Sequence, residues 1–195
     1  MRIGIMGGTF DPIHIGHLIA AERARVDGGL DEVWFMPTFV PPHKERAPLG
    51  SPEQRLEMVR LATEENPHFK ACDFELRKGG VSYSIYTVEQ LTAAHPAYSF
   101  YYIIGGDMVQ YLPKWFEIDR LVTKVKFLGL DRGGYVIDHD QLPAQISSVV
   151  TMVEMPNIEL SSTFIRSKVH AGDSIRYLVT ESVNTYIKEC GLYES

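Results

Sequence analysis

The chain has little cysteine. Cys72 and Cys190 are its only two cysteines, they lie far apart in the sequence, and neither belongs to a Cys-x-x-Cys pair. A disulfide framework or a zinc knuckle needs several closely spaced cysteines, so neither kind of scaffold is indicated.

Long apolar runs are missing too. No stretch approaches the roughly 20 apolar residues that a membrane-spanning helix needs. The apolar start, residues 1–6, is shorter than the core of a secretory signal peptide. Together with the scarcity of cysteine, these absences favour a cytoplasmic protein in a reducing compartment.

Positive charge is also scarce. Lysine and arginine number 19 against 25 aspartate and glutamate residues, which gives a formal net charge of -6 and a pI near 5.6. Proteins that bind long nucleic acids usually need a broad basic face, so no nucleic-acid partner is expected. A small anionic ligand stays compatible, because it needs only a few well-placed cations.

The chain is long enough for one good hydrophobic core. Its 195 residues are 45% hydrophobic, and we expect a single domain over residues 1–195. Apolar runs of strand length alternate with segments of helical period, which is typical of βαβ units and predicts an α/β fold with a parallel sheet. Strands are expected at residues 3–6, 33–36, 69–74, 100–104, 125–130 and 149–153, and helices from about residues 16, 52, 86, 118, 162 and 180.

The second of these helices has a recognisable start. Ser51 is a suitable N-cap, Pro52 suits the first helical position, and Gln54 follows the cap by three residues, as in a capping box. Before this helix lies a long, proline-rich connection, residues 38–50, which carries histidine, lysine and arginine. Long connections in compact domains are often functional, so this segment is a candidate lid.

The most specific signal follows the first expected strand. It is the run Gly7-Gly8-Thr9-Phe10-Asp11-Pro12-Ile13-His14-Ile15-Gly16-His17. Glycines let the backbone approach a phosphate chain, and a helix N-terminus offers free N–H groups to it. His14 and His17 can project from neighbouring positions at that helix end and donate hydrogen bonds to phosphoryl oxygens. Alternatively, the glycines only form a turn and the histidines are structural.

This run resembles the signature of the nucleotidyltransferase superfamily, which is related to the His-Ile-Gly-His signature of class I aminoacyl-tRNA synthetases. The resemblance extends over nearly the whole chain. It implies a Rossmann-like, doubly wound parallel sheet with a C-terminal helical portion, and ATP as a substrate.

A second motif lies near the C-terminus, at Leu160-Ser161-Ser162-Thr163-Phe164-Ile165-Arg166. Hydroxyl groups before a helix can serve simply as caps. The motif also resembles the family's Ile-Ser-Ser-Thr-x-Ile-Arg phosphate site, with leucine in place of the first isoleucine. The resemblance implies that these hydroxyls and Arg166 hold the β and γ phosphates of ATP.

Gly105-Gly106-Asp107 follows an expected buried strand. Its aspartate can bond ribose hydroxyls or adenosine while the glycines admit the nucleoside, and a turn with an N-cap explains it equally well. With the resemblance, the expected ATP-binding residues are Gly7, Gly8, Thr9, Phe10, His14, Gly16, His17, Gly105, Asp107, Ser161, Ser162, Thr163 and Arg166.

Three further groups of residues match the pattern of nicotinate-nucleotide adenylyltransferases. They are Pro41-Pro42-His43-Lys44, Tyr83-Ser84-x-x-Thr87 and Tyr111-x-x-x-Trp115. The resemblance implies that Trp115 stacks on a pyridine ring with Tyr111 near it, that the backbone at Tyr83 and Ser84 meets the ring carboxylate, and that Lys44 and Thr87 hold phosphate. Arg132 follows a strand where the family tends to show Arg-Pro-Gly-Tyr, and is a further candidate contact. For each aromatic taken alone, core packing stays open.

The implied reaction is attack by the phosphate of nicotinate mononucleotide on the α-phosphorus of ATP, giving deamido-NAD and pyrophosphate. His14, His17, Lys44 and Arg166 are the expected catalytic residues. Mg²⁺ is expected to come with ATP, held by phosphate oxygens and waters without a named protein ligand.

Several alternatives stay open. Nicotinamide mononucleotide or phosphopantetheine can be the acceptor, CTP can replace ATP, and the chain can be a nucleotide-binding regulator without chemistry. The oligomeric state is open as well, with a homodimer among the alternatives.

Overall fold

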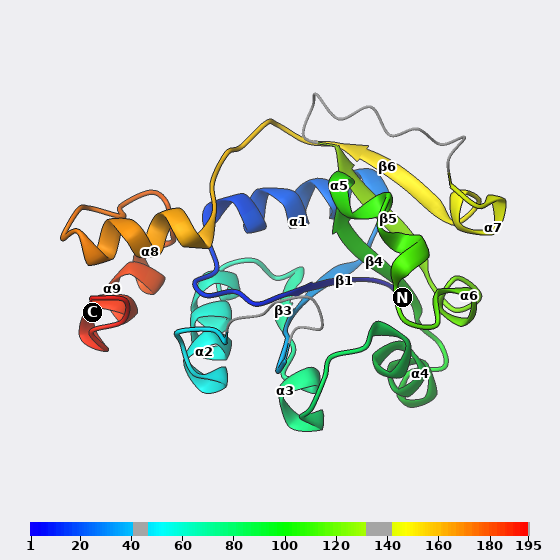
Figure 1. Cartoon of the computed structure of the whole chain (residues 1–195), viewed down its shortest axis with the longest axis horizontal. Helices are drawn as coiled ribbons and strands as arrows, with labels where there is room; N and C mark the ends of the chain where they lie inside the picture. Colours follow the sequence, from blue (N-terminus) through cyan, green and yellow to red (C-terminus); the bar gives the residue numbers. More distant parts are fainter. Residues whose placement is uncertain (41–46, 132–141, 195) are drawn as a thin grey trace.

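The structure is a computed structural model that describes residues 1–40, 47–131 and 142–194. Its centre is a six-stranded sheet in which every pairing is parallel. The strands are β1 (Arg2–Gly8), β2 (Glu32–Pro37), β3 (Phe69–Ala71), β4 (Ser99–Gly105), β5 (Lys126–Asp131) and β6 (Val150–Glu154). These bounds confirm the predicted α/β fold with a parallel sheet (Figure 1).

The strand order is β3-β2-β1-β4-β5-β6. The chain therefore builds the sheet outward from β1 in one direction and then, starting at β4, in the other. This order is that of a doubly wound, Rossmann-like sheet, in which ligands bind beyond the carboxyl ends of the strands where the order reverses. Here the reversal lies between β1 and β4, whose neighbouring ends carry Gly7, Gly8 and Gly105.

Helices connect the strands and cover the sheet. They are α1 (Ile15–Gly28), α2 (Pro52–Thr63), α3 (Phe74–Lys78), α4 (Ser84–Ala94), α5 (Gly106–Val109), the 3₁₀ turn η1 (Leu112–Lys114), α6 (Ile118–Leu121), α7 (Ala144–Ser147), α8 (Ser162–His170) and α9 (Glu181–Glu189). Helices α8 and α9 form the expected C-terminal helical portion. In Figure 1 they lie beyond the sheet, beside the N-terminal end of α1.

Both faces of the sheet are buried. Phe35 and Ile103 pack into a cluster with side chains of α1, α2 and α9, while their chain neighbours Met36 and Ile104 pack into a second cluster with α4, α5 and α6. Alternate residues of a strand point to opposite faces, so strands covered on both sides appear in the sequence as continuous apolar runs. That is why the strands could be predicted.

One predicted strand is wrong in its second half. The expected strand 69–74 ends at Ala71, and Phe74 begins helix α3. Strand β3 pairs only with β2, the last paired residue being Ala71 opposite Phe35, and the Cys72 N–H still donates to the Phe35 carbonyl. Strand β2 itself ends two residues after Phe35, at Pro37, which has no N–H to donate to a neighbouring strand.

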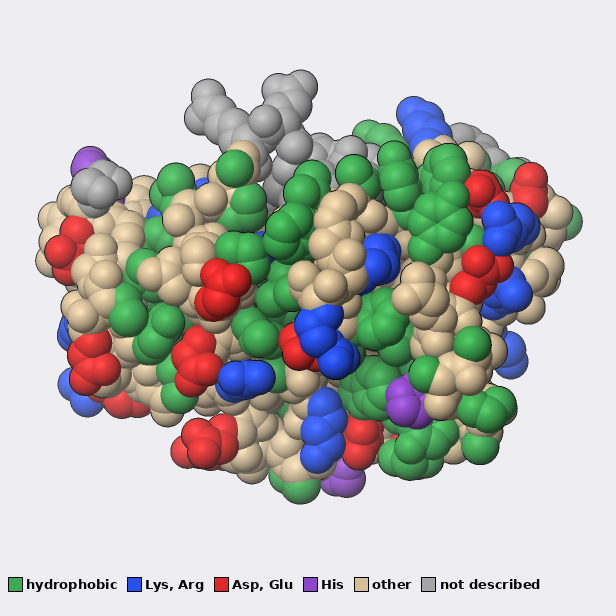
Figure 2. All heavy atoms as spheres, turned by 90° about the horizontal axis from the view of Figure 1, so that it is seen from below, with side chains coloured by type: hydrophobic (Ala, Val, Ile, Leu, Met, Phe, Trp, Pro, Cys, Tyr) green, Lys and Arg blue, Asp and Glu red, His purple; other side chains and the backbone are tan. Residues whose placement is uncertain are grey.

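No helix in the described ranges is long and apolar enough to cross a membrane. The face of the molecule drawn in Figure 2 carries basic and acidic side chains interspersed with apolar ones. The described residues of this face therefore form no broad basic patch of the kind that long nucleic acids need.

Candidate active site

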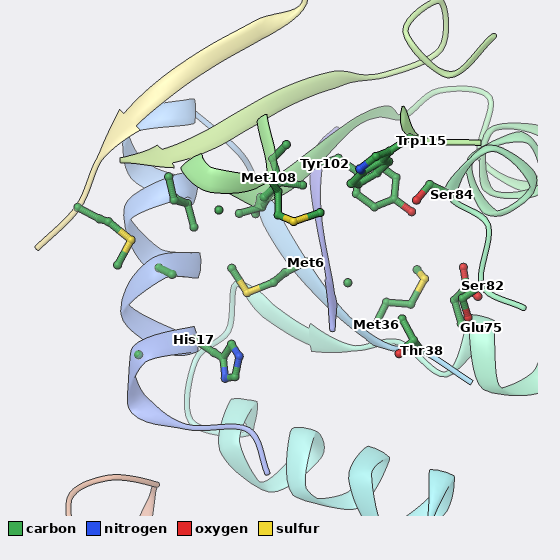
Figure 3. Close-up of a pocket in the computed structure, with 18 of the residues that line it drawn as sticks. Met6, His17, Met36, Thr38, Glu75, Ser82, Ser84, Tyr102, Met108 and Trp115 are labelled. Carbon is green, nitrogen blue, oxygen red and sulfur yellow. The ribbon is translucent and has the colours of Figure 1, made fainter. Parts of the chain in front are cut away.

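A cavity of about 360 Å³ opens at the carboxyl ends of β1 and β4, where the strand order reverses. Figure 3 shows His17 on one side of it and Ser84 and Trp115 on the other. The predicted site residues that line it are Gly7, His14, Gly16, His17, Tyr83, Ser84, Gly105 and Trp115. The structure thus brings together residues from four separate sequence motifs.

The two histidines form a stacked pair at the start of α1. His14 is the N-cap, and its backbone N–H donates to Nδ1 of His17 over 3.2 Å. The two ring centroids are 3.7 Å apart at an interplanar angle of 27°. Because His17 Nδ1 accepts a hydrogen bond, the proton of the neutral ring is on Nε2, which makes that atom a donor.

Gly16 permits this packing. A Cβ at that position would lie 3.1 Å from Nδ1 of His14, closer than ordinary van der Waals contact. The ring of Phe10, a residue with the unusual positive φ of 50°, meets His17 edge to face with centroids 5.1 Å apart. His17 is therefore held between His14 and Phe10, and Phe10 contributes through packing, since it does not line the cavity.

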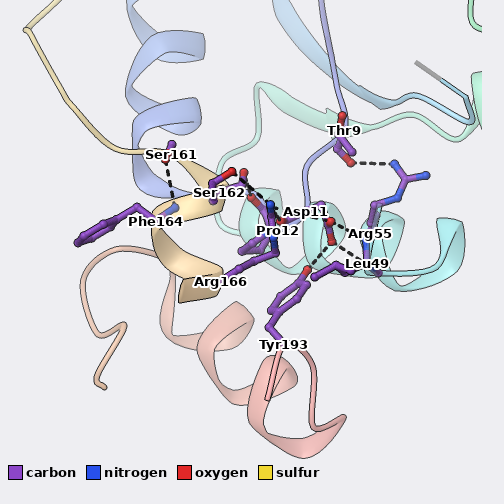
Figure 4. Close-up of polar contacts among 12 residues, drawn as sticks. Thr9, Asp11, Pro12, Leu49, Arg55, Ser161, Ser162, Phe164, Arg166 and Tyr193 are labelled. Carbon is purple, nitrogen blue, oxygen red and sulfur yellow. Dashed lines mark hydrogen bonds and ion pairs between the residues drawn. The ribbon is translucent and has the colours of Figure 1, made fainter. Parts of the chain in front are cut away.

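The second motif lies at the N-terminus of α8, against the turn that precedes His14 (Figure 4). Ser162 Oγ donates to the Pro12 carbonyl over 2.9 Å, and Arg166 Nη1 donates to the Asp11 carbonyl over 2.7 Å. Arg166 Nη2 also donates to Thr163 Oγ1 over 3.2 Å. Two motifs separated by about 150 residues of sequence are thus joined by direct hydrogen bonds.

Ser161 caps helix α8. Its Oγ accepts a hydrogen bond from the backbone N–H of Phe164 over 3.2 Å. The capping interpretation therefore holds for Ser161, while Ser162 uses its hydroxyl to bind the turn at Pro12. The N-terminus of α1 lies at the cavity, and the α8 N-terminus is hydrogen-bonded to the turn that precedes it. Both suit an anionic ligand, because a helix begins with N–H groups that carry a partial positive charge.

Gly105 ends β4 and lines the cavity. A Cβ there would lie 2.5 Å from Oδ1 of Asp107, so a larger residue would displace that carboxylate. Asp107 is exposed and is the second residue of α5, whereas the N-cap is Gly105 without a side-chain bond. Asp107 is thus not the helix cap and presents its carboxylate to the solvent beside the cavity.

Trp115 and Ser84 form the end of the cavity away from the histidines. The indole meets Tyr102 and Phe127 edge to face, each with centroids 6.1 Å apart. Its Nε1–H is buried and has no hydrogen-bond partner among the residues that the structure describes. Trp115 therefore packs against the core and lines the cavity at the same time, with an unused donor.

Sequence reasoning missed part of this wall. Tyr102, Met6, Met36 and Met108 line the cavity, yet the sequence shows them only as members of apolar strands or as neighbours of a glycine motif. Burial raises the pKa of the Tyr102 hydroxyl, although a hydrogen bond with Ser84 opposes this. Tyr102 therefore stays a neutral phenol beside Ser84.

Some predicted ligand contacts lie away from the cavity. Tyr111 is 53% exposed, with Lys114 Nζ 5.2 Å from its ring centroid. Thr87 is fully buried and donates to the carboxylate of Glu75, which itself lines the cavity. The other predicted contacts that do not line the cavity are Gly8, Thr9, Asp107, Ser161, Ser162, Thr163 and Arg166. Lys44 and Arg132 lie outside the described residues.

Comparisons with known proteins agree with this geometry. The model of the cytidylyltransferase-like family matches residues 5–168. A protein of Oceanobacillus iheyensis named "Probable nicotinate-nucleotide adenylyltransferase" is 46% identical over 192 residues, which are 98% of this chain and 96% of that protein. A Bacillus cereus protein of the same name is also 46% identical, over 100% of this chain and 99% of its own.

Solved structures share the fold. A Plasmodium falciparum nicotinic acid mononucleotide adenylyltransferase complexed with NaAD superposes with a TM-score of 0.79 and 20% identity, over 99% of this chain and 97% of that one. The same enzyme complexed with APC gives a TM-score of 0.77. From the family model and the two full-length relatives, the chain belongs to the cytidylyltransferase-like family and, within it, to the nicotinate-nucleotide adenylyltransferases.

Proposed function

We propose that the protein transfers the adenylyl group of ATP to nicotinate mononucleotide, forming deamido-NAD and pyrophosphate in NAD biosynthesis. The observation that carries this proposal is a cavity with the histidine pair at one end and Trp115 at the other, where the α8 motif is hydrogen-bonded to the turn that precedes the histidines. We further propose that it acts in the cytoplasm on free small molecules, without nucleic acid.

The chemistry needs no nucleophile from the protein. A phosphate monoester has a second pKa near ~6, so at neutral pH the acceptor phosphate is largely a dianion and attacks the α-phosphorus directly. Catalysis then depends on in-line positioning and on neutralising the charge that develops on the phosphoryl oxygens. His17 Nε2–H is the donor we assign to the α-phosphate, with His14 stacked against it.

The triphosphate is proposed to lie between the N-termini of α1 and α8. Arg166 and Ser162 already bind the carbonyls of the intervening turn, so their side chains are ordered before ATP arrives. Arg166 has donors beyond those it uses on the turn, because a guanidinium carries five N–H groups. Lys44 is a further clamp that we propose from the family resemblance.

The acceptor is proposed to place its pyridine ring on Trp115. A flat ring suits an indole surface, and the first turn of α4, which begins at Ser84, has no side-chain cap on its N–H groups. Those N–H groups suit the ring carboxylate of nicotinate. Asp107 is proposed to bond the adenosine ribose from beside Gly105.

Mg²⁺ is proposed to enter with ATP. In the part of the chain that the structure describes, no three histidine, cysteine, aspartate or glutamate side chains lie close enough to hold an ion. Mg²⁺ commonly keeps several waters and binds substrate phosphates, where it neutralises charge. We therefore expect a chelator to abolish activity without lowering the melting temperature of the ligand-free protein, as differential scanning fluorimetry would show. A chelator-induced fall in that temperature would contradict this and indicate a protein-held metal.

The function is tested by pyrophosphate release with ATP and Mg²⁺, comparing nicotinate mononucleotide, nicotinamide mononucleotide and phosphopantetheine under identical conditions. We expect a strong preference for the first acceptor. A preference for another acceptor would contradict the ring-carboxylate site at Ser84, and release only when CTP replaces ATP would contradict the assigned nucleotide. If no combination of nucleotide and acceptor releases pyrophosphate, a nucleotide-binding regulator without chemistry becomes the better explanation.

A further inference from the structure

The turn before the histidines is held by residues from four distant parts of the chain. Its centre is Asp11, whose carboxylate is 4% exposed. Oδ2 accepts from the Leu49 N–H over 2.8 Å, and Oδ1 accepts from the Gly50 N–H over 2.9 Å. Oδ1 also accepts from the hydroxyl of Tyr193 over 2.7 Å, 182 residues away (Figure 4).

The backbone of the same turn is bound at three of its carbonyls. Arg55 Nη1 of helix α2 donates to the Thr9 carbonyl over 2.7 Å. The carbonyls of Asp11 and Pro12 accept from the α8 side chains described above. Each of these contacts depends on a residue that comes later in the chain, and two of them are made by Arg55 and Tyr193.

Arg55 is an unusual residue at this place. Its side chain is among the largest fully buried ones, 1% exposed, and within the described part of the chain its Nε has no hydrogen-bond partner. Burial lowers the pKa of its guanidinium, and the Asp11 carboxylate is the main group that opposes this. A buried cation is costly unless its surroundings compensate it, so a core that needed only stability would be served by an apolar side chain here.

Tyr193 is fixed as a donor. Burial and the neighbouring Asp11 carboxylate raise the pKa of its hydroxyl, so the phenol keeps its proton near neutral pH. It lies close to the C-terminal end of the described chain, after α9, and its ring is 7% exposed. The segment after α9 thus reaches the turn that leads to the histidines.

We propose that Arg55 and Tyr193 are positioning residues for adenylyl transfer: they hold the Thr9 carbonyl and the Asp11 carboxylate, and thereby fix where His14 and His17 stand. Pro12 and Ile13 are the only residues between this anchored aspartate and His14, so a shift of the turn moves the histidine pair directly. A displacement of about 1 Å in a catalytic group can cost on the order of 100-fold in rate. The inference rests on the proposed function.

The first test removes one hydroxyl. Tyr193→Phe keeps the ring in the core and deletes the hydrogen bond to Asp11, and the matched control is Tyr186→Phe on α9. We expect kcat of Tyr193→Phe to fall about tenfold, with the KM values for both substrates within about twofold of wild type. Tyr186→Phe should leave kcat unchanged. Rates are taken well below each melting temperature, so that only folded protein is compared.

A second measurement separates positioning from stability. Because the His14 and His17 rings are stacked, their NMR signals report on their mutual position, and we expect these signals to move in Tyr193→Phe and to stay in Tyr186→Phe. A lower melting temperature with unchanged kcat and unchanged histidine signals would overturn the proposal. If wild type releases no pyrophosphate, the proposed function fails, and the histidine signals still test the positioning.

Arg55→Lys gives an independent test, with Arg60→Lys as its control. Lysine keeps the charge but has a single ammonium in place of the planar fork that binds the Thr9 carbonyl. Arg60 is on the same helix, with a 59% exposed side chain paired to Glu57. We expect kcat to fall about tenfold in Arg55→Lys only. Equal kcat in the two variants would overturn the role of Arg55, whatever the change in stability.

Discussion

Replacing His17 with alanine is expected to lower kcat by roughly 100- to 1000-fold, the usual cost of removing one preorganised donor to a developing oxyanion. The KM for ATP should change far less, because the charge that the imidazole stabilises grows mainly in the transition state. The structural reason is the fixed ring: Nδ1 accepts from the His14 N–H, so Nε2 carries the donating proton. Steady-state kinetics of pyrophosphate release measure both constants.

Two variants make this result interpretable. His17→Gln keeps an N–H donor on a side chain of similar reach and is expected to recover part of the lost kcat. His170→Ala, at the exposed end of α8, removes a histidine far from the turn and should leave kcat unchanged. A His17→Ala enzyme with near-normal kcat would defeat the assignment of His17 as the donor to the α-phosphate.

The second large effect is expected at Arg166. Arg166→Ala should lower kcat/KM for ATP by roughly 100-fold or more, because arginine clamps on transferring phosphoryl groups contribute strongly. The Arg166 side chain is 25% exposed, and its Nη1 donates to the Asp11 carbonyl over 2.7 Å and lies 4.0 Å from Oδ2 of the Asp11 carboxylate. Its removal therefore deletes a cation of the phosphate end and one of the anchors of the histidine turn.

Arg166→Lys and Arg176→Ala complete this experiment. Arg166→Lys keeps a positive charge, but its ammonium group lacks the planar, two-pronged geometry of the guanidinium. Compared with Arg166→Ala, only part of the lost activity should therefore return. Arg176 is exposed, stacks on Tyr177 with 5.6 Å from its Cζ to the ring centroid, and serves as the control. An Arg166→Ala enzyme that loses thermal stability but keeps kcat/KM would show that this arginine contributes to stability only, and neither binds phosphate nor positions the histidines.

The parts of the fold that local sequence patterns determine could be predicted. The capping box is confirmed, since Ser51 Oγ accepts from the Gln54 N–H and the Gln54 side chain accepts from the Ser51 N–H. The strands were visible because both faces of the sheet are buried. Helices α3, α5 and α7 have only four or five residues each, too few to show a helical period.

The motifs of the site could be predicted from the sequence, but the contacts between residues far apart in the sequence could not. The histidine pair follows from a spacing of three at a helix start. Nothing in the local sequence of Thr87 reveals that its hydroxyl faces Glu75, because that depends on how α3 packs against α4. The bond from Tyr193 to Asp11 is likewise a product of the whole topology, and no spacing rule spans it.

We propose that one cavity holds the adenylyl donor at the histidines and the acceptor ring at Trp115. A crystal structure of the protein with deamido-NAD tests it most directly, because this product contains both halves. We predict the adenylate phosphate within hydrogen-bonding distance of His17 Nε2 and the pyridine ring stacked on the Trp115 indole. A product bound with its pyridine ring away from Trp115, or with its phosphates away from the histidine pair, would contradict the account.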